Sequence, residues 1–277
     1  YKLTHLQSDC VFNKPPFKYG ICTLSVIALR ANPSDKAEMV SQLLFGEVFE
    51  VLGASEDGKW LFIRLHSDQY EGWIDSLQAT PLQENYYTAH IAQPHPVCSS
   101  PCALLRLDQQ VLYITAGATL PFYENGSGYI NKQYYWYEEG YRKAEAATVE
   151  TLLAIAQSYL HSPYLWGGRS LWGIDCSGFV QQVFKTAGYH LRRDAYQQAE
   201  QGCLVESLSQ AQAGDLAFFE REGRIIHVGL LVAPDQIIHA RGAVRIDPLD
   251  ATGILDEAAG AYSHQLAFVR RIININQ

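Results

Sequence analysis

The stretch Tyr164-Leu-Trp-Gly-Gly-Arg-Ser-Leu-Trp-Gly-Ile-Asp-Cys-Ser-Gly-Phe179 decides how the C-terminal half of this chain is interpreted. The apolar residues that follow it recur at helical spacing, which predicts a helix that begins near Cys176 and ends before Gly188. Asp175 stands where it can cap this helix. Cys176 is therefore expected at a helix N-terminus, where the partial positive charge of unpaired N–H groups favours thiolate over thiol.

The residues next to Cys176 suit a reacting sulfur. Ser177 and Gly178 are small, so the backbone beside the sulfur can be approached closely. The Cys176 amide is free to donate a hydrogen bond to a developing oxyanion. This arrangement is typical of nucleophilic catalysis, provided that a base is near.

Two histidines, His227 and His239, are candidates for that base and its orienting partner. They lie in strand-like runs on either side of a turn at Ala233-Pro-Asp-Gln236. A hairpin there brings both onto neighbouring antiparallel strands, directly opposed or diagonal. We expect His227 to pair with Cys176 and His239 to hold the other ring nitrogen of His227.

Each of these features also has an ordinary structural explanation. A single cysteine at a helix start is usually a small buried apolar residue. Paired histidines can be core residues or metal ligands, and the glycine pair after Trp166 can be a simple turn. Their occurrence together, in one order, favours thiol catalysis.

The region from 149 onward predicts an α+β fold. Apolar residues between Val149 and Leu160 fall at helical spacing, with Thr148 placed to cap the start. The two predicted helices are followed by strand-like runs at 215–219, 227–232, 236–239, 244–246 and 266–269. Helices first and strands afterwards indicate an antiparallel sheet with helices packed against it.

The preceding half is expected to consist of two small β modules. Short β-branched and aromatic runs separated by polar turns occur at 25–29, 46–52, 60–65 and 72–74. A looser second copy occurs at 103–107, 119–123, 128–131 and 133–137, after a proline-rich linker at 92–96. We therefore expect domains at 1–82, 83–148 and 149–277.

Composition limits the partners. The net charge is −8, and no basic stripe is present, which argues against nucleic acid and favours a small soluble substrate. No apolar run reaches the roughly 18 residues that span a bilayer. Six scattered cysteines favour a reducing, cytoplasmic compartment, although a chain that begins at Tyr1 leaves room for a removed leader and a periplasmic or secreted location.

A second histidine and cysteine cluster raises the question of a metal. His90, His95, Cys98 and Cys102 lie within thirteen residues, but their spacing matches no common zinc knuckle. A simple loop or a Cys98–Cys102 redox pair is the preferred interpretation. We expect no metal and no cofactor.

The C-terminal motifs resemble those of the NlpC/P60 family of cell-wall endopeptidases. The resemblance is carried by 164–180, Ala213-Gly-Asp-Leu-Ala-Phe-Phe219, His227-Val-Gly229 and Ile238-His-Ala240, which together span most of residues 149–277. It implies a papain-like fold in which Cys176 is the nucleophile, His227 the base and His239 the orienter. It also implies that Tyr164 helps the Cys176 amide to form the oxyanion site.

The N-terminal half resembles bacterial SH3-type domains, closely in the first copy and loosely in the second. The whole arrangement is similar to γ-D-glutamyl-L-diamino acid endopeptidases that recycle murein peptides. In those enzymes the first SH3-type domain roofs the cleft and restricts it to peptides with a free N-terminal L-Ala. The implied substrate-binding residues are Asp194, Ser177, Glu38, Tyr70 and Asp175.

The resemblance thus implies a peptidase, expected to be a monomer, that cuts L-Ala-γ-D-Glu from diaminopimelate or L-Lys in free muropeptides. Glu38 as a solvated surface acid and Tyr70 as a barrel aromatic remain alternatives. Two other functions remain open: another thiol amidase or acyltransferase on the same fold, and a murein-binding module with a vestigial hydrolase.

Overall fold

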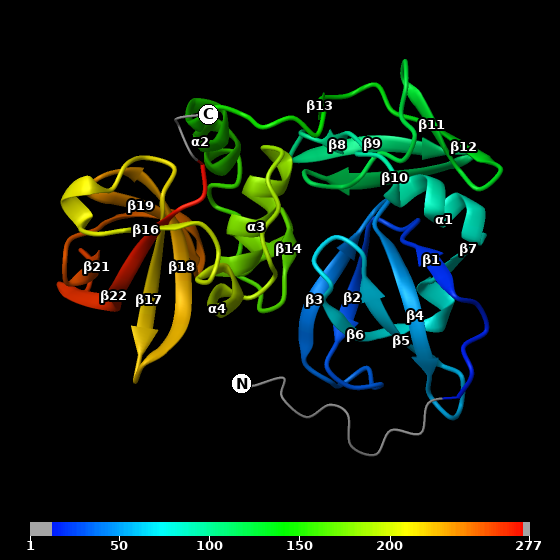
Figure 1. Cartoon of the computed structure of the whole chain (residues 1–277), viewed down its shortest axis with the longest axis horizontal. Coiled ribbons are helices and arrows are strands. Elements are labelled where there is room, and N and C mark those ends of the chain that lie inside the picture. Colours follow the sequence, from blue (N-terminus) through cyan, green and yellow to red (C-terminus); the bar gives the residue numbers. More distant parts are fainter. Residues whose placement is uncertain (1–12, 274–277) are drawn as a thin grey trace.

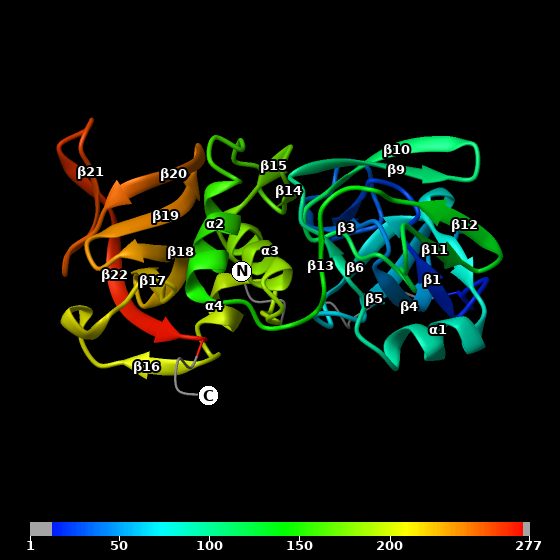
Figure 2. The same cartoon turned by 90° about the horizontal axis from the view of Figure 1, so that it is seen from above.

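The computed structural model describes residues 13–273, so Cys10 and the two ends of the chain lie outside the described residues. The described chain forms three units, which we call the N-terminal unit (19–82), the middle unit (84–142) and the C-terminal unit (149–271). In Figures 1 and 2 the helices α2 and α3 lie between the C-terminal sheet on one side and the other two units on the other. Across residues 13–273, no helix has the length and apolar character that a bilayer crossing requires.

The N-terminal unit is a seven-stranded antiparallel sheet in the order β3-β2-β6-β5-β4-β1-β7. Its apolar residues alternate along the strands and bury one face, with Ile27, Leu43 and Ile63 fully inaccessible. The strands are β1 (Tyr19–Ile21), β2 (Val26–Arg30), β3 (Met39–Leu44), β4 (Val48–Ala54), β5 (Trp60–Leu65), β6 (Glu71–Asp75) and β7 (Thr80–Leu82).

The middle unit begins with a helix and continues as a four-stranded sheet in the order β10-β9-β12-β11. The buried ring of Tyr135 packs edge-on against Phe45 and so joins this sheet to the N-terminal unit. Its elements are α1 (Glu84–Ile91), β8 (Val97–Cys98), β9 (Cys102–Leu107), β10 (Gln110–Thr115), β11 (Ser127–Ile130), β12 (Gln133–Trp136) and β13 (Tyr141–Arg142).

Two local expectations for the middle unit are wrong. Residues 119–123 do not form a strand, because Phe122 has φ of 50°, a left-handed conformation that a strand does not accommodate. The strand lies earlier, at β10, whose partners on β9 run from Leu107 back to Cys102. The helix α1 lies in a half that was expected to be wholly β, and it buries aromatic rings, Tyr86 and Tyr87, that favour strands in isolation.

The C-terminal unit confirms the predicted α+β fold. Its sheet has the order β16-β22-β17-β18-β19-β20, with β21 paired to β22. The helices are α2 (Val149–Gln157), α3 (Cys176–Thr186) and α4 (Ala195–Gln198). The strands are β14 (Arg169–Ser170), β15 (Gly173–Ile174), β16 (Cys203–Val205), β17 (Leu216–Arg221), β18 (Arg224–Ala233), β19 (Gln236–Arg241), β20 (Ala243–Pro248), β21 (Gly253–Asp256) and β22 (Ala261–Arg271).

The ends of the two main helices are where the sequence places them. The Thr148 hydroxyl accepts a hydrogen bond from the Thr151 amide and starts α2. Beyond α3, Gly188 has φ of +86°, and a Cβ there would lie 2.3 Å from the carbonyl oxygen of Glu145. Only glycine fits that turn without a shift, which fixes where α3 ends.

Candidate active site

Cys176 is the first residue of α3. Its neighbour Asp175 caps the helix by accepting a 2.6 Å hydrogen bond from the Gly178 amide. As the first helical residue, Cys176 has an amide with no acceptor within the helix, so this N–H is available to an oxyanion. A Cβ on Gly178 would lie 2.2 Å from the Gly168 carbonyl oxygen, so glycine is needed for the approach of that loop to the helix start.

The surroundings of Cys176 oppose the ionisation that its place at the helix start favours. Burial, together with the negative charge of Asp175, raises the pKa of Cys176 to about 12. The amides of Val228 and Ser177 and the charge of Arg193 act in the opposite direction but are outweighed. Desolvation thus opposes the thiolate, and a thiol in this position needs a base to remove its proton.

Three side chains on adjacent strands form a hydrogen-bonded relay that ends at His227. Nε2 of His227 on β18 lies 2.8 Å from Nδ1 of His239 on β19, and Nε2 of His239 lies 2.9 Å from Asp247 Oδ2 on β20. The Asp247 carboxylate can only accept, so His239 Nε2–H donates to it and His239 Nδ1 accepts from His227. His227 therefore keeps its proton on Nε2 and has a free lone pair on Nδ1, as a general base requires.

The electrostatics of this relay keep the base neutral. Burial, followed by the nearby His239, His264 and Arg241, holds the pKa of His227 well below its ordinary 6.5. The pKa of Asp247 is lowered because hydrogen bonds from His239 and Arg245 outweigh its burial. Burial thus disfavours the charged forms of both the thiol and the imidazole.

Cys176 and His227 meet where α3 packs on β18. The amide of Val228, the residue after His227, interacts with the Cys176 sulfur. Tyr164 approaches from another direction, since its phenol interacts electrostatically with both Cys176 and Asp175. Burial and these two groups raise the pKa of Tyr164, so its hydroxyl stays protonated and able to donate. The structure thus gathers Cys176, His227, His239 and Tyr164 in one place.

Two further groups at this site were not identified from the sequence. Asp247 completes the relay, and His264 on β22 stacks on His227 with ring centroids 4.2 Å apart and planes 24° apart. Burial is the main reason that the pKa of His264 falls to about 4, so this neighbour is uncharged near neutral pH. Asp247 bonds His239 from the paired strand β20, and His264 reaches His227 from β22, which is two strands away in the sheet. No local motif marks either residue.

Asp175 and Ser177, expected to bind substrate, are occupied by the chain itself. The fully buried Arg193 donates from Nη2 to Asp175 Oδ2 at 2.7 Å and from Nη1 to Asp175 Oδ1 at 3.0 Å. Nη1 also reaches Ser177 Oγ at 2.9 Å, and Nε donates to Ser41 Oγ on β3 at 2.9 Å. Arg193, another residue that sequence reasoning missed, therefore ties the start of α3 to the N-terminal unit.

Tyr70 and Asp194 are brought together from different units. The Tyr70 hydroxyl lies 3.2 Å from each carboxylate oxygen of Asp194. Burial raises the pKa of Asp194, although Arg193 and Tyr70 oppose the shift. A half-buried carboxylate with a raised pKa gains from a cationic partner, because a nearby positive charge stabilises its ionised form.

Glu38 lies at the edge of this junction and is exposed. Its Oε1 accepts a 2.6 Å hydrogen bond from the indole of Trp166, within the loop that leads to Cys176. It contacts Trp166 and not Tyr70 or Asp194. The loop itself lies against β3, because a Cβ on Gly167 would come within 2.3 Å of the Met39 carbonyl oxygen.

The cluster at His90, His95, Cys98 and Cys102 is part of the packing of the middle unit. Cys98 and Cys102 are free thiols, and the Tyr137 hydroxyl donates to Cys98 Sγ at 3.2 Å. His95 bridges the His90 carbonyl and the Phe122 amide. Among residues 13–273, no group of three His, Cys, Asp or Glu side chains is arranged to hold a metal ion.

Comparison with known proteins bears on both halves of the chain. The NlpC/P60 family profile matches residues 161–262, and the profile of the bacterial dipeptidyl-peptidase Sh3 domain matches residues 29–78. The chain is 31% identical to the γ-D-glutamyl-L-lysine dipeptidyl-peptidase of Bacillus subtilis, over 92% of this chain and 84% of that protein. It is 28% identical to the protein of the same name in Bacillus cereus, over 81% of this chain and 74% of that one.

A solved structure shares the fold. The crystal structure of an NlpC/P60 family protein from Bacillus cereus superposes with a TM-score of 0.78 at 21% identity, covering 92% of this chain and all of that one. The fold and the similarity define a papain-like cysteine peptidase preceded by SH3-like units. The chain belongs to the NlpC/P60 family, and it acts on peptide substrates.

Proposed function

We propose that this peptidase hydrolyses the amide between γ-D-Glu and the diamino acid in murein peptides that carry a free N-terminal L-Ala. Two observations support the substrate. Relatives aligned over most of the chain are γ-D-glutamyl-L-lysine dipeptidyl-peptidases. The Tyr70–Asp194 pair supplies a carboxylate close to the nucleophile helix and suited to an ammonium group.

The reaction follows from the protonation states of the site. Cys176 Sγ attacks the scissile carbonyl while its proton passes to Nδ1 of His227. The Cys176 amide and the protonated hydroxyl of Tyr164 donate to the oxyanion. His227 then gives its proton to the leaving amine, which leaves L-Ala-γ-D-Glu as a thioester on Cys176. Water, deprotonated by His227, attacks the thioester and releases the dipeptide and the thiol.

Substrate selection is proposed to lie at the junction of the N-terminal and C-terminal units. Asp194 receives the ammonium of L-Ala, with Tyr70 holding the carboxylate in place. Glu38 acts at the rim by fixing Trp166 over the loop before Cys176. Asp175 and Ser177 act as positioning residues, because their side chains are engaged with Arg193. The proposed enzyme is a cytoplasmic monomer of three domains. The first, at 1–82, roofs the cleft; the second, at 83–148, is a spacer; and the third, at 149–277, is catalytic.

The direct test is mass spectrometry of the products from L-Ala-γ-D-Glu-L-Lys and its diaminopimelate counterpart, each with free and with N-acetylated L-Ala. We expect cleavage after γ-D-Glu only in the free peptides. Asp194→Asn is expected to lower kcat/KM on free peptides about 100-fold, as loss of one partner of a charge pair does. Asp108→Asn, an exposed acid of the middle unit, is the matched control. Equal cleavage of acetylated peptides would contradict the proposed amine site.

Transfer to an amine acceptor is the competing reaction for a thioester enzyme. The same assay with added amines distinguishes the two. Hydrolysis predicts a free dipeptide carboxylate as the product at every amine concentration. A product that carries the added amine would instead identify an acyltransferase.

A further inference from the structure

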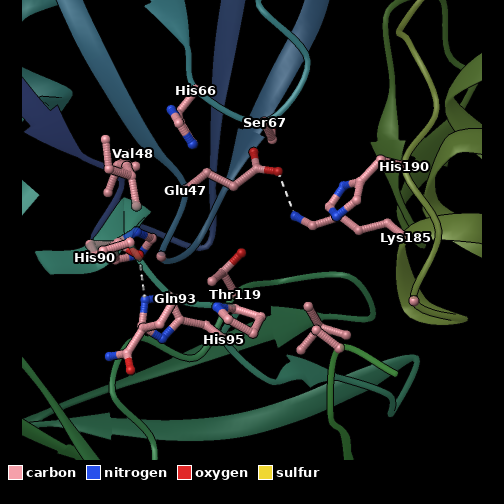
Figure 3. A pocket seen from close by; sticks show the side chains of 17 residues that line it. Glu47, Val48, His66, Ser67, His90, Gln93, His95, Thr119, Lys185 and His190 are labelled. Carbon is pink, nitrogen blue, oxygen red and sulfur yellow. Dashed lines mark hydrogen bonds and ion pairs between the residues drawn. The ribbon is translucent and has the colours of Figure 1, made fainter. Parts of the chain in front are cut away.

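A cavity separate from the catalytic residues lies where the three units meet. Its volume is about 450 Å³, within the range of small-molecule sites. Figure 3 shows Glu47 and His66 entering from the N-terminal unit, His90 and His95 from the middle unit, and Lys185 and His190 from the C-terminal unit. Residues that are far apart in the sequence therefore line a single cavity.

The lining is rich in cationic and imidazole groups. Among the lining residues in the described part of the chain, Glu47 is the only acid. Its carboxylate is already paired with the Arg169 guanidinium at 2.8 and 3.0 Å and with Lys185 Nζ at 2.7 Å. Two cations against one carboxylate leave an excess of positive charge at the wall formed by Lys185.

One buried histidine on this lining has ring nitrogens without a hydrogen-bond partner among residues 13–273. His90 is 7% exposed, and neither of its ring nitrogens makes a hydrogen bond. His66 and His190 line the same cavity and are exposed. Buried polar groups without a partner are uncommon in folded proteins and call for a ligand or water.

These groups also disfavour the protonated form of one another's rings. Burial first, then His95, His66 and Lys185, lowers the pKa of His90 to about 3. Burial and Lys185 likewise lower the pKa of His190. An anion among them would favour the protonated, cationic forms of these rings and would accept their N–H donors.

The geometry of the donors favours a tetrahedral anion. A guanidinium fork suits a planar carboxylate, but the fork of Arg169 is already engaged with Glu47. What remains are separate donors, the free N–H groups of Lys185 and single imidazole nitrogens from three units. Single hydrogen-bond donors that approach from several directions suit the oxygens of a tetrahedral phosphate. The volume exceeds that of phosphate alone, and Val48, Ala92 and Val97 provide an apolar wall for an organic portion.

We propose that this cavity binds a small phosphate monoester, with its phosphate among Lys185, His66, His90 and His190 and its organic portion against Val48 and Val97. Because Lys185 also reaches Glu47 of the N-terminal unit, the bound ligand stabilises the junction of the units. The site is independent of the peptidase reaction and of the peptide that the enzyme cuts.

Thermal unfolding of the full chain at neutral pH tests the proposal. The Tm is measured with glucose 6-phosphate or inorganic phosphate, and with glucose or sodium chloride as controls at matched ionic strength. We expect both phosphate compounds to raise Tm by about 2–4 °C when in large excess over Kd, and glucose and chloride to have no such effect. The variant carrying His66→Asn and His190→Asn, both exposed positions outside the catalytic residues, should lose the rise. His161→Asn, an exposed histidine outside the cavity, should retain it.

Isothermal titration of glucose 6-phosphate gives a second measurement that does not depend on unfolding. We expect at least tenfold weaker binding to the double variant than to the parent chain, and unchanged binding to His161→Asn. The proposal is overturned by an equal Tm rise in the double variant, by an equal rise with chloride, or by a rise with inorganic phosphate alone.

Discussion

At the scale of single residues, the orientation of the proposed base depends on a carboxylate that contacts it only through a second histidine. Asp247 fixes the tautomer of His239, and His239 fixes that of His227, through hydrogen bonds of 2.9 and 2.8 Å. The stacked ring of His264 holds the plane of His227. The base is therefore a positioned, neutral imidazole with its lone pair on Nδ1.

Replacing Asp247 by Asn should change which ring nitrogens of His239 and His227 donate and which accept hydrogen bonds. An amide can donate as well as accept, so His239 no longer has to present Nδ1 as an acceptor. We expect kcat to fall about 100-fold with KM little changed, less than the loss of roughly 10⁴ caused by the equivalent change next to a catalytic histidine. Steady-state kinetics check this, and Asp235→Asn in the exposed β18–β19 turn is the control. A variant with normal kcat would remove Asp247 from the relay.

The neutral base also sets the pH dependence. The pKa of His227 is lowered well below 6.5, so the imidazole stays unprotonated as pH falls through that value. We expect kcat/KM to remain on its plateau at pH 6.5 and to decline only at more acid pH. A pH–rate profile with its acid midpoint at or above 6.5 would show that the base is not held neutral by burial.

Sequence analysis reached part of this site. Local motifs that can be recognised in the sequence contain Cys176, His227 and His239, and the structure brings these residues together. Asp247, His264 and Arg193 were not found, because their contacts depend on sheet register and on interunit packing. The burial that raises the pKa of Cys176 could not be predicted, because a helix-start motif does not show how deeply the sulfur is buried in the folded chain.

At the scale of elements, the start of α3 is tied to β3, the edge strand of the sheet in the N-terminal unit. Arg193 links Asp175 and Ser177 at the helix N-terminus to Ser41 on β3. The nucleophile is thus positioned by the N-terminal unit as well as by its own helix. Elements with clear caps, α2 and α3, were predicted from sequence, whereas α1 and β10 depend on tertiary packing and were missed.

Arg193→Lys tests this link while keeping the charge. A single ammonium cannot reproduce the four hydrogen bonds of the guanidinium, so Asp175 and α3 lose their alignment. We expect kcat/KM to fall about 10- to 100-fold, mostly in kcat, with the fold retained by circular dichroism. Ser41→Ala should lower it by a few-fold, because it removes only the contact with β3. Arg192→Lys, at an exposed neighbour, should have no effect, and an equal loss there would contradict the assignment.

At the scale of the whole molecule, the units are joined by buried charge. Glu47 of the N-terminal unit is 3% exposed and pairs with Arg169 and Lys185 of the C-terminal unit. Burial raises its pKa, but the two cations outweigh this and hold the pKa at about 2. The sequence indicated the SH3-like units and the peptidase unit, but not this junction, because no pattern within one unit specifies its partner on another.

Glu47→Gln should therefore destabilise the molecule by about 3–5 kcal/mol, since it leaves two buried cations without their anion. Because the folded pKa is depressed from 4.5, the contribution of Glu47 is complete above pH 4.5 and is lost as pH falls toward about 2. Urea unfolding at neutral and acid pH measures both effects. Glu71→Gln, at an ion pair with Arg64 that is about 40% exposed, should cost less than about 1 kcal/mol. Equal losses in the two variants would mean that the buried junction is not a special source of stability.

Detection of a covalent intermediate on Cys176 tests the proposed mechanism most directly. L-Ala-γ-D-Glu-L-Lys is mixed with the enzyme, quenched in acid within one turnover, and the peptides of the digested protein are weighed. We expect the peptide that contains Cys176 to gain the mass of the L-Ala-γ-D-Glu acyl group, and Cys176→Ala to show neither adduct nor turnover. Full turnover by Cys176→Ala, or an adduct on another residue, would contradict the assignment of Cys176 as the nucleophile.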